Sequence, residues 1–235
     1  MDAFRIGVIF DCDGTLIDSM MVWRETEAGL ARRANVTLTA AEIDALTAMT
    51  IPECGAFFHE KFGLGESDHE VVGMIDEYML DFYRHRAEAR PGALVFVQGL
   101  AQAGAHLTVA SSSPKPYLMA GIERCGFAPY LERVLSVEDV HSTKREPDVW
   151  DRAREIMGTS KQLTWGVEDS AYAIGTLAGA GYRTLAIYDS DDAGTWDALQ
   201  ASAEHAIRGF EDLTVEEFLA WNEQPLFVGT ANKQA

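Results

Sequence analysis

Two pairs of acidic residues in this sequence could do chemistry. Asp11 and Asp13 directly follow a short apolar run, and Glu168 and Asp169 directly follow another. Two carboxylates held this close repel each other unless a cation lies between them or one is protonated. Taken alone, the first pair has the simpler alternative of an acidic turn, and Asp169 has that of a cap for the next helix. If the fold brings the two pairs together, they predict a cation site.

Hydroxyl groups and a lysine follow other apolar runs. Ser111, Ser112 and Ser113 precede Pro114, a favoured residue for the first turn of a helix, and Ser113 is expected to cap that helix. A hydroxyl beside main-chain N–H groups at a helix N-terminus is suited to bind phosphate. Lys144 would add a compact positive charge ahead of the next helix. Together with the acidic pairs, these residues indicate phosphate chemistry.

These side chains need a scaffold that brings strand ends together. Short apolar runs alternate with stretches of helical periodicity, and the alternation predicts a parallel sheet in a doubly wound, Rossmann-like α/β fold. Polar residues after successive parallel strands then meet at the carboxyl edge of the sheet. The expected strands are residues 6–10, 107–110, 134–137, 163–167 and 184–187, and the expected helices of this part are 93–103, 115–124 and 148–157.

One interval departs from this alternation. Residues 18–90 contain no convincing strand but several helical patterns, at 20–33, 40–48, 52–62 and 67–86. The sequence therefore predicts an α/β core domain over 1–17 and 91–235, with an inserted helical cap domain over 18–90. Both chain crossings lie at one edge of the core, where they could serve as hinges.

Length and charge narrow the class of protein. A chain of 235 residues fits one large domain or a core with an insertion. The net charge of −18 disfavours binding to nucleic acid or to an anionic membrane surface, although a local metal ion still permits a small anionic substrate. No run is long enough to span a membrane and no C-x-x-C spacing is present, and we expect that the N-terminal apolar stretch is not a signal peptide. We expect a soluble, cytoplasmic, monomeric protein.

The order of the motifs resembles the haloacid dehalogenase superfamily of phosphohydrolases. The D-x-D-G-T motif stands at residues 11–15, the strand-closing Ser or Thr at Ser111, the Lys before a P-D pair at 144–148, and E-D-S at 168–170. The resemblance reaches to about Glu223. The insertion looks like the cap of the subgroup containing beta-phosphoglucomutase and small sugar-phosphate or phosphoglycolate phosphatases.

The third motif departs from the pattern of the family. It usually reads G-K-P-x-P-D, whereas residues 143–148 read Thr-Lys-Arg-Glu-Pro-Asp. The lysine and the P-D pair are retained. We expect Arg145 and Glu146 to reshape the loop around Lys144 without removing its charge.

The resemblance implies an Mg²⁺-dependent phosphatase that hydrolyses a small phosphate monoester, such as a sugar phosphate. Asp11 would be the nucleophile that becomes an aspartyl phosphate, and Asp13 the general acid and base. The catalytic set would be Asp11, Asp13, Ser111 and Lys144. The phosphate-binding set would be Asp11, Gly14, Thr15, Ser111, Ser112 and Lys144. Mg²⁺ would be held by Asp11, the main-chain carbonyl of Asp13, Asp169 and Glu168, the last directly or through water.

Two other functions use similar residues. A beta-phosphoglucomutase-type mutase has a His twelve positions after the nucleophile and a cap Arg, but this chain has Trp23 there and neither Lys nor Arg over residues 34–60. Lys61, Arg84 and Arg86 remain as cap cations. A phospho-receiver binding protein also combines Asp, Mg²⁺, a hydroxyl and Lys, but it needs a much shorter chain and no cap. Both comparisons favour the phosphatase.

Overall fold

The computed structural model describes residues 6–47, 49–189 and 195–223. The chain divides into two compact units, one formed by Met1–Asp18 with Ala87–Ala235 and the other by Ser19–Arg86. The first unit contains the sheet, and the second is built from helices. The helical unit falls within the segment that the sequence sets apart as an insertion.

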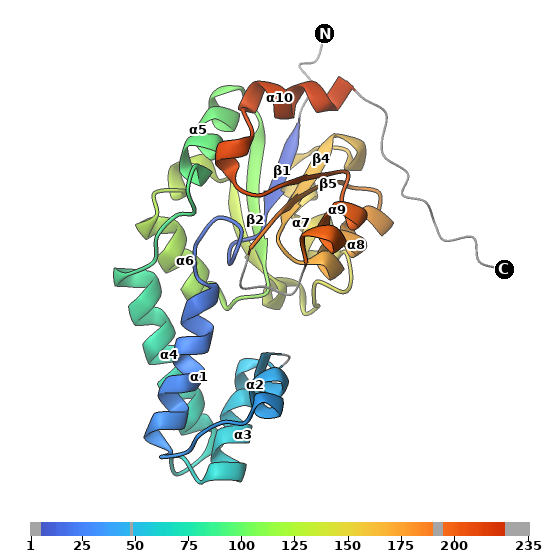
Figure 1. Ribbon diagram of the computed structural model, residues 1–235. Coiled ribbons are helices and arrows are strands. Elements are labelled where there is room, and N and C mark those ends of the chain that lie inside the picture. The colour runs from blue at the N-terminus through green and yellow to red at the C-terminus, as the bar shows by residue number, and fades with distance from the viewer. Residues whose placement is uncertain (1–5, 48, 190–194, 224–235) are drawn as a thin grey trace, which may run out of the picture. The chain divides into compact units, whose positions relative to one another are not determined.

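The sheet of the first unit has six parallel strands in the order β3-β2-β1-β4-β5-β6 (Figure 1). This is the order of a doubly wound Rossmann-like sheet, so the predicted fold class is confirmed. The last strand, β6, is an addition that the sequence did not predict. The strands are β1 (Gly7–Phe10), β2 (His106–Ser111), β3 (Arg133–Ser136), β4 (Thr164–Glu168), β5 (Arg183–Ile187) and β6 (His205–Ile207).

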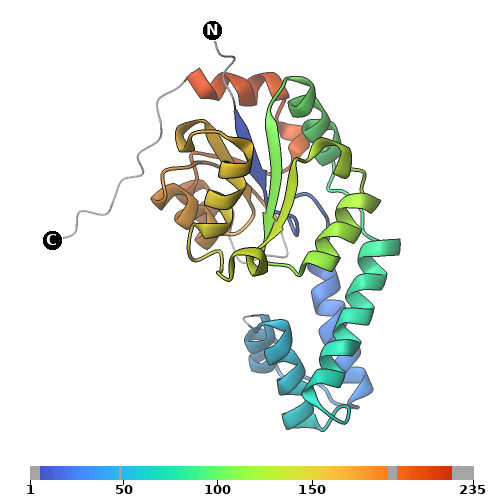
Figure 2. The ribbon, with the colours of Figure 1, turned by 180° about the vertical axis from the view of Figure 1, so that it is seen from behind.

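Helices lie on both sides of this sheet (Figures 1 and 2). Side chains alternate between the two faces of a strand, and each face of β1 has its own apolar cluster. Ile9 packs with Trp150 and Leu177, whereas the Phe10 ring lies 6.5 Å from that of Phe210. The helices of this unit are α5 (Ala93–Gln102), α6 (Lys115–Arg124), α7 (Asp148–Met157), α8 (Ala171–Gly179), α9 (Trp196–Ser202) and α10 (Val215–Ala220).

The helical unit has its own small core. Its helices are α1 (Met20–Arg33), α2 (Ala40–Thr47), α3 (Ile51–Phe62) and α4 (Asp68–His85). Every fourth residue along α4, from Val71 through Ile75 and Met79 to Tyr83, is buried, which is the pattern of an amphipathic helix. Thr50 and Glu53 form a capping box that fixes the start of α3. These local signals explain why the helices form where the sequence predicts them.

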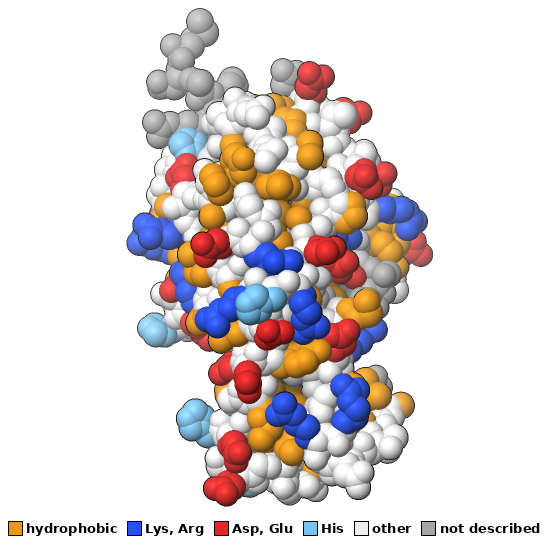
Figure 3. All heavy atoms as spheres, turned by 90° about the vertical axis from the view of Figure 1, so that its left-hand side faces the viewer, with side chains coloured by type: hydrophobic (Ala, Val, Ile, Leu, Met, Phe, Trp, Pro, Cys, Tyr) orange, Lys and Arg blue, Asp and Glu red, His pale blue; other side chains and the backbone are white. Residues whose placement is uncertain are grey.

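The surface carries charges of both signs. Figure 3 shows Lys and Arg side chains interspersed with Asp and Glu on one face of the protein. Within the described part of the chain, no helix is long and apolar enough to cross a membrane.

Gly166 in β4 packs directly against Leu177 of α8. A Cβ placed on Gly166 would come within 2.3 Å of Leu177 Cδ1, and Leu177 is completely buried. We expect Gly166→Ala to lower the free energy of unfolding by about 1–3 kcal/mol through overpacking. Gly175→Ala in the middle of α8 meets no atom within 4 Å and should raise it by about 0.4–1 kcal/mol. Urea unfolding measures both, and a Gly166→Ala protein as stable as the wild type would contradict this packing.

Candidate active site

The predicted nucleophile lies at the switch point of the sheet. The chain runs from β1 outward to β3 and then returns to β4 on the other side of β1, so the order of the strands reverses between β1 and β4. Ligands bind at the carboxyl ends of the strands at such a point. Asp11 directly follows β1 and donates its N–H to the Val167 carbonyl at 2.9 Å, and Glu168 ends β4. The two predicted acidic pairs therefore reach the same edge.

A tight loop follows Asp11. Leu16 and Ile17 both donate their N–H groups to the Cys12 carbonyl at 2.9 Å, and the Gly14 N–H donates to Ile17 at 3.0 Å. Gly14 has φ 72°, a left-handed conformation that glycine adopts without strain. Since the Gly14 carbonyl also accepts from Arg90, both main-chain polar groups of Gly14 are used inside the protein. This geometry favours a role for Gly14 in shaping the loop.

Arg90 is a supporting residue that the sequence analysis did not identify. Its guanidinium donates to the Gly14 carbonyl, to Asp189 Oδ2 at 3.1 Å and to the Tyr188 carbonyl at 2.7 Å. Its main-chain N–H donates to Leu16 at 2.9 Å. Arg90 thereby connects the loop after β1 with the segment after β5 through hydrogen bonds. No local sequence pattern predicts these contacts, because Arg90 and its partners lie far apart in the chain.

Lys144 bridges the two acidic clusters. Its Nζ lies 2.5 Å from Asp11 Oδ1 and 2.5 Å from Glu168 Oε1, and the lysine side chain is only 4% exposed. Burial disfavours its charge, but Asp11 and Glu168 outweigh burial and hold the pKa of the ammonium above its ordinary value. Burial raises the pKa of the Asp11 carboxyl, and the charge of Lys144 acts in the opposite direction. The lysine is therefore protonated and compensates part of the buried negative charge.

Asp11, Glu168 and Asp169 form a buried group of carboxylates. Each offers an oxygen, and these oxygens lie within 4.8 Å of one another. When all three carboxylates are ionised and the Lys144 ammonium is counted, this buried group has an excess of two negative charges. The number of oxygens, their type and this charge all fit a hard divalent cation such as Mg²⁺. The Asp13 side chain does not belong to this group, and the sequence assigned only its main-chain carbonyl to the metal.

The Asp13 carboxylate is held by the loop after β2. Ser111 ends that strand and is 2% exposed, and its Oγ accepts the Ser113 N–H at 3.1 Å. The Ser113 hydroxyl donates to Asp13 Oδ2 at 2.6 Å. The expectation that Ser113 caps the next helix is wrong, because Pro114 is the residue before α6 and no side chain caps it. Ser113 instead orients Asp13, whereas Ser112 is exposed.

Two hydroxyls near these residues are buried. In the part of the chain that the structure describes, Thr15 Oγ1 and Ser170 Oγ have no hydrogen-bond partner. Leaving such a group unpaired costs about 1–3 kcal/mol. Thr15 belongs to the set expected to bind phosphate.

Cys12, which lies between Asp11 and Asp13 in the sequence, is completely buried. Burial, together with the charges of Asp13 and Asp11, raises the pKa of its thiol well above the ordinary value, so the thiol stays protonated.

The unusual third motif leaves the position of Lys144 intact. Arg145 and Glu146 are exposed, and their N–H groups donate to the Thr143 hydroxyl at 3.2 Å and the Thr143 carbonyl at 3.1 Å. The guanidinium carbon of Arg145 lies 5.3 Å from the centre of the Tyr172 ring on α8. The loop thus turns outward at Arg145 while Lys144 points inward to the carboxylates.

The sequence signature of the haloacid dehalogenase-like hydrolases matches residues 7–181. The chain belongs to this family. Hexitol phosphatase A of Escherichia coli K12 is 26% identical over 77% of this chain and 82% of its own length. Validoxylamine A 7'-phosphate phosphatase of Streptomyces hygroscopicus subsp. limoneus is 25% identical over 79% and 86%. The resemblance stated from the motifs is confirmed, and this haloacid dehalogenase-like hydrolase is an enzyme of the phosphatase type.

Solved structures share the fold of this hydrolase. The beta-phosphoglucomutase of Clostridium difficile superposes with a TM-score of 0.73 at 14% identity, covering 94% of this chain and 98% of that chain. At this identity the likeness shows the fold alone. Membership in a hydrolase family favours an enzyme over the phospho-receiver alternative.

Proposed function

We propose that this hydrolase is an Mg²⁺-dependent phosphatase that transfers a phosphoryl group from a small phosphate monoester to Asp11 and then to water. The observation that carries the proposal is the bridging of Asp11 and Glu168 by buried Lys144, next to Asp169 at the switch point of the sheet. A nucleophile, a cation site and a fixed positive charge together are what phosphoryl transfer needs, because its catalysis is mostly positioning and electrostatic stabilisation.

In the first step, an Asp11 carboxylate oxygen attacks phosphorus, and the bond between phosphorus and the ester oxygen breaks. Asp13 donates a proton to the leaving oxygen, so the alcohol departs neutral. The Ser113 hydroxyl, 2.6 Å from Asp13 Oδ2, holds this carboxyl in place. Lys144 and the Ser111 hydroxyl stabilise the charge that spreads over the phosphoryl oxygens.

In the second step, water attacks the phosphorus of the aspartyl phosphate and the bond to the Asp11 oxygen breaks. Asp13, now ionised, accepts a proton from that water, which returns both aspartates to their starting states and releases inorganic phosphate. Asp11, Glu168 and Asp169 would hold Mg²⁺, which would supply charge compensation for the phosphoryl oxygens. The names of the two phosphatase relatives support hydrolysis of a phosphate monoester, with sugar phosphates as the first candidates.

Hydrolysis fits the cap better than the mutase reaction does. A mutase must hold a bisphosphate while it reorients, and this needs a cationic grip. Lys61 is paired with Glu42 at 2.7 Å, and Arg86 lies 3.6 Å from Asp81, both within the helical unit. With beta-glucose 1-phosphate and a bisphosphate primer, we expect release of inorganic phosphate at most. Catalytic accumulation of glucose 6-phosphate would show a mutase instead.

Metal dependence provides a test that does not require the natural substrate. Chelator should abolish hydrolysis of an aryl phosphate, Mg²⁺ should restore it, and Ca²⁺ should support it poorly because its coordination is looser. Mg²⁺ at about 100 times its Kd should also stabilise the wild type by about 2.7 kcal/mol, and this effect should be lost in Asp169→Asn. Thermal unfolding with and without Mg²⁺ measures it. Full activity in excess chelator would overturn the proposal.

A further inference from the structure

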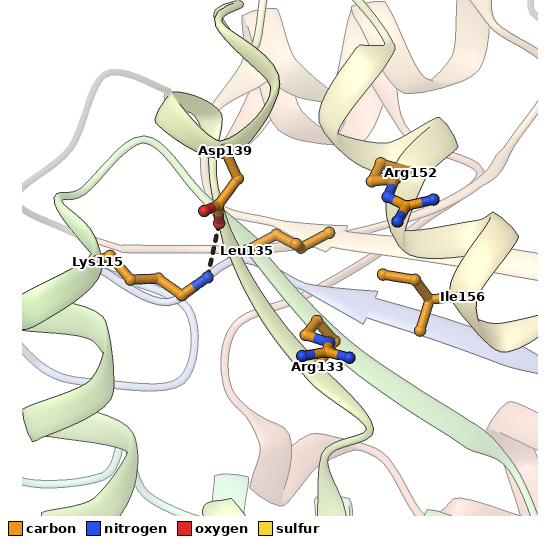
Figure 4. Close-up of a pocket in the computed structure, with 6 residues that line it drawn as sticks. All are labelled: Lys115, Arg133, Leu135, Asp139, Arg152 and Ile156. Atoms are coloured by element: carbon orange, nitrogen blue, oxygen red, sulfur yellow. Dashed lines mark hydrogen bonds and ion pairs between the residues drawn. The ribbon is translucent and has the colours of Figure 1, made fainter.

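A second cluster of charged residues surrounds β3 and contains none of the proposed catalytic residues. Lys115 on α6, Arg133 on β3 and Arg152 on α7 line a cavity of about 350 Å³ together with Leu135, Asp139 and Ile156. Figure 4 shows the three cationic side chains around the same space, each carried by a different element. None of the residues assigned to the proposed reaction lines this cavity. It is therefore a separate place on the core unit.

The charge of this cavity is opposite to that of the whole protein. Its lining holds three cations and one carboxylate, whereas the chain as a whole has a net charge of −18. A hollow lined mainly by charges of one sign focuses its field, so these cations attract small anions. The volume is that of a small-molecule site, and Leu135 and Ile156 give it an apolar part.

The cations are available to a ligand. Arg133 is exposed, and among the residues that the structure describes its guanidinium makes no hydrogen bond and no ion pair, while its charge helps to lower the pKa of Asp139. Arg152 has an exposed contact with Glu155 at 3.4 Å, and Lys115 has an exposed pair with Asp139 at 2.6 Å. Exposed ion pairs of this kind contribute little stability, so an incoming anion can replace them.

We propose that this cavity binds a phosphate group, carried by inorganic phosphate or by a small phosphorylated metabolite, between Arg133, Arg152 and Lys115. Arginine presents its N–H groups in a planar fork that matches phosphate oxygens in pairs, and Lys115 adds a third, movable donor. Leu135 and Ile156 would contact the organic part of a metabolite. This goes beyond the proposed reaction, since binding here needs neither Asp11 nor a metal.

A short series of hydrogen bonds connects the cavity with Asp13. Asp139 Oδ2, the partner of Lys115, accepts the Ser136 N–H at 2.9 Å. The Ser136 hydroxyl donates to the Ser113 carbonyl at 2.9 Å, and the Ser113 hydroxyl donates to Asp13. An anion that draws Lys115 from Asp139 therefore acts on the first member of this series. We therefore expect phosphate binding in the cavity to change the amide chemical shift of Ser113.

Phosphate titration followed by amide chemical shifts tests the proposal, with chelator present so that no metal assists binding at the catalytic residues. We expect saturable shifts at residues 133–139 and 152–156 and at Ser113. Affinity should fall at least tenfold in the double variant Arg133→Gln with Arg152→Gln. The control is Arg32→Gln with Arg33→Gln, which removes the same charge from two exposed arginines of α1 and should bind phosphate at the cavity as the wild type does.

The remaining outcomes identify the ligand or reject the site. Tighter binding of a sugar phosphonate than of inorganic phosphate would identify a phosphorylated metabolite, and the reverse order would identify free phosphate. Absence of saturable shifts at the cavity, equal affinity in the double variant, or tighter binding of malonate than of either phosphate probe would overturn the proposal. The measurement is independent of hydrolysis, so failure of the proposed reaction would not affect it.

Discussion

Asp11→Asn is expected to lower turnover of any phosphate ester by at least about 10⁴-fold, because the amide cannot attack phosphorus and no aspartyl phosphate forms. Asn has nearly the shape of Asp and can still accept a hydrogen bond from Lys144, which lies 2.5 Å from Asp11 Oδ1. The fold should therefore survive. Steady-state hydrolysis of an aryl phosphate with Mg²⁺ measures the loss, and unfolding by urea checks stability.

Asp212→Asn provides the matched control for this variant. Asp212 is an exposed carboxylate in the short 3₁₀ turn Phe210–Asp212 and belongs to none of the proposed catalytic, phosphate-binding or metal-binding sets, and its change to Asn alters the net charge by the same amount. It should keep the wild-type rate. Near-normal turnover in Asp11→Asn would mean that another group attacks phosphorus.

Asp13→Asn is expected to slow turnover by about 10²–10⁴-fold, the contribution of a positioned general acid and base. An asparagine at this position can neither protonate the leaving oxygen nor accept a proton from water. The leaving group of an aryl phosphate needs little protonation. With this substrate, Asp13→Asn should therefore slow the first step less than the second. A phosphorylated protein should therefore accumulate, and intact-mass measurement after rapid quenching detects it.

Ser113→Ala tests the orientation of the Asp13 carboxylate separately from its role in proton transfer. It removes the hydroxyl that donates to Asp13 at 2.6 Å but leaves the carboxylate, so its rate should lie between those of the wild type and Asp13→Asn. If Asp13→Asn hydrolysed the aryl phosphate at the wild-type rate without accumulating phosphoenzyme, Asp13 would not be the acid and base.

The parts of the fold that were predictable have local causes. The strand ending at Phe10 is a continuous buried apolar run, and the insertion is recognisable from helical periodicity and caps such as Thr50. The family motifs named the residues at strand ends, and the parallel sheet explains why Asp11 and Glu168 meet. The strand β6 lacked such a signal, because His205–Ile207 is short and forms by pairing with β5 at the edge of the sheet.

The parts that were not predictable depend on contacts between distant residues. Ser113 has the sequence context of a helix cap, but its hydroxyl donates to Asp13, and only the folded loop shows this. The motif identified Lys144 without indicating that it contacts both Asp11 and Glu168. Arg90 and the cavity around Arg133 combine residues from several elements, and no periodicity or spacing in the sequence brings them together.

The most direct test of the proposed function is to locate the phosphoryl group during turnover. The wild type is mixed with a radiolabelled aryl phosphate and Mg²⁺, quenched in acid within milliseconds, digested and mapped by mass spectrometry. The proposed reaction predicts label on the peptide that contains Asp11, at a level that rises in Asp13→Asn and is absent from Asp11→Asn. Hydrolysis without label on that peptide at any time, or label on another residue, would contradict it.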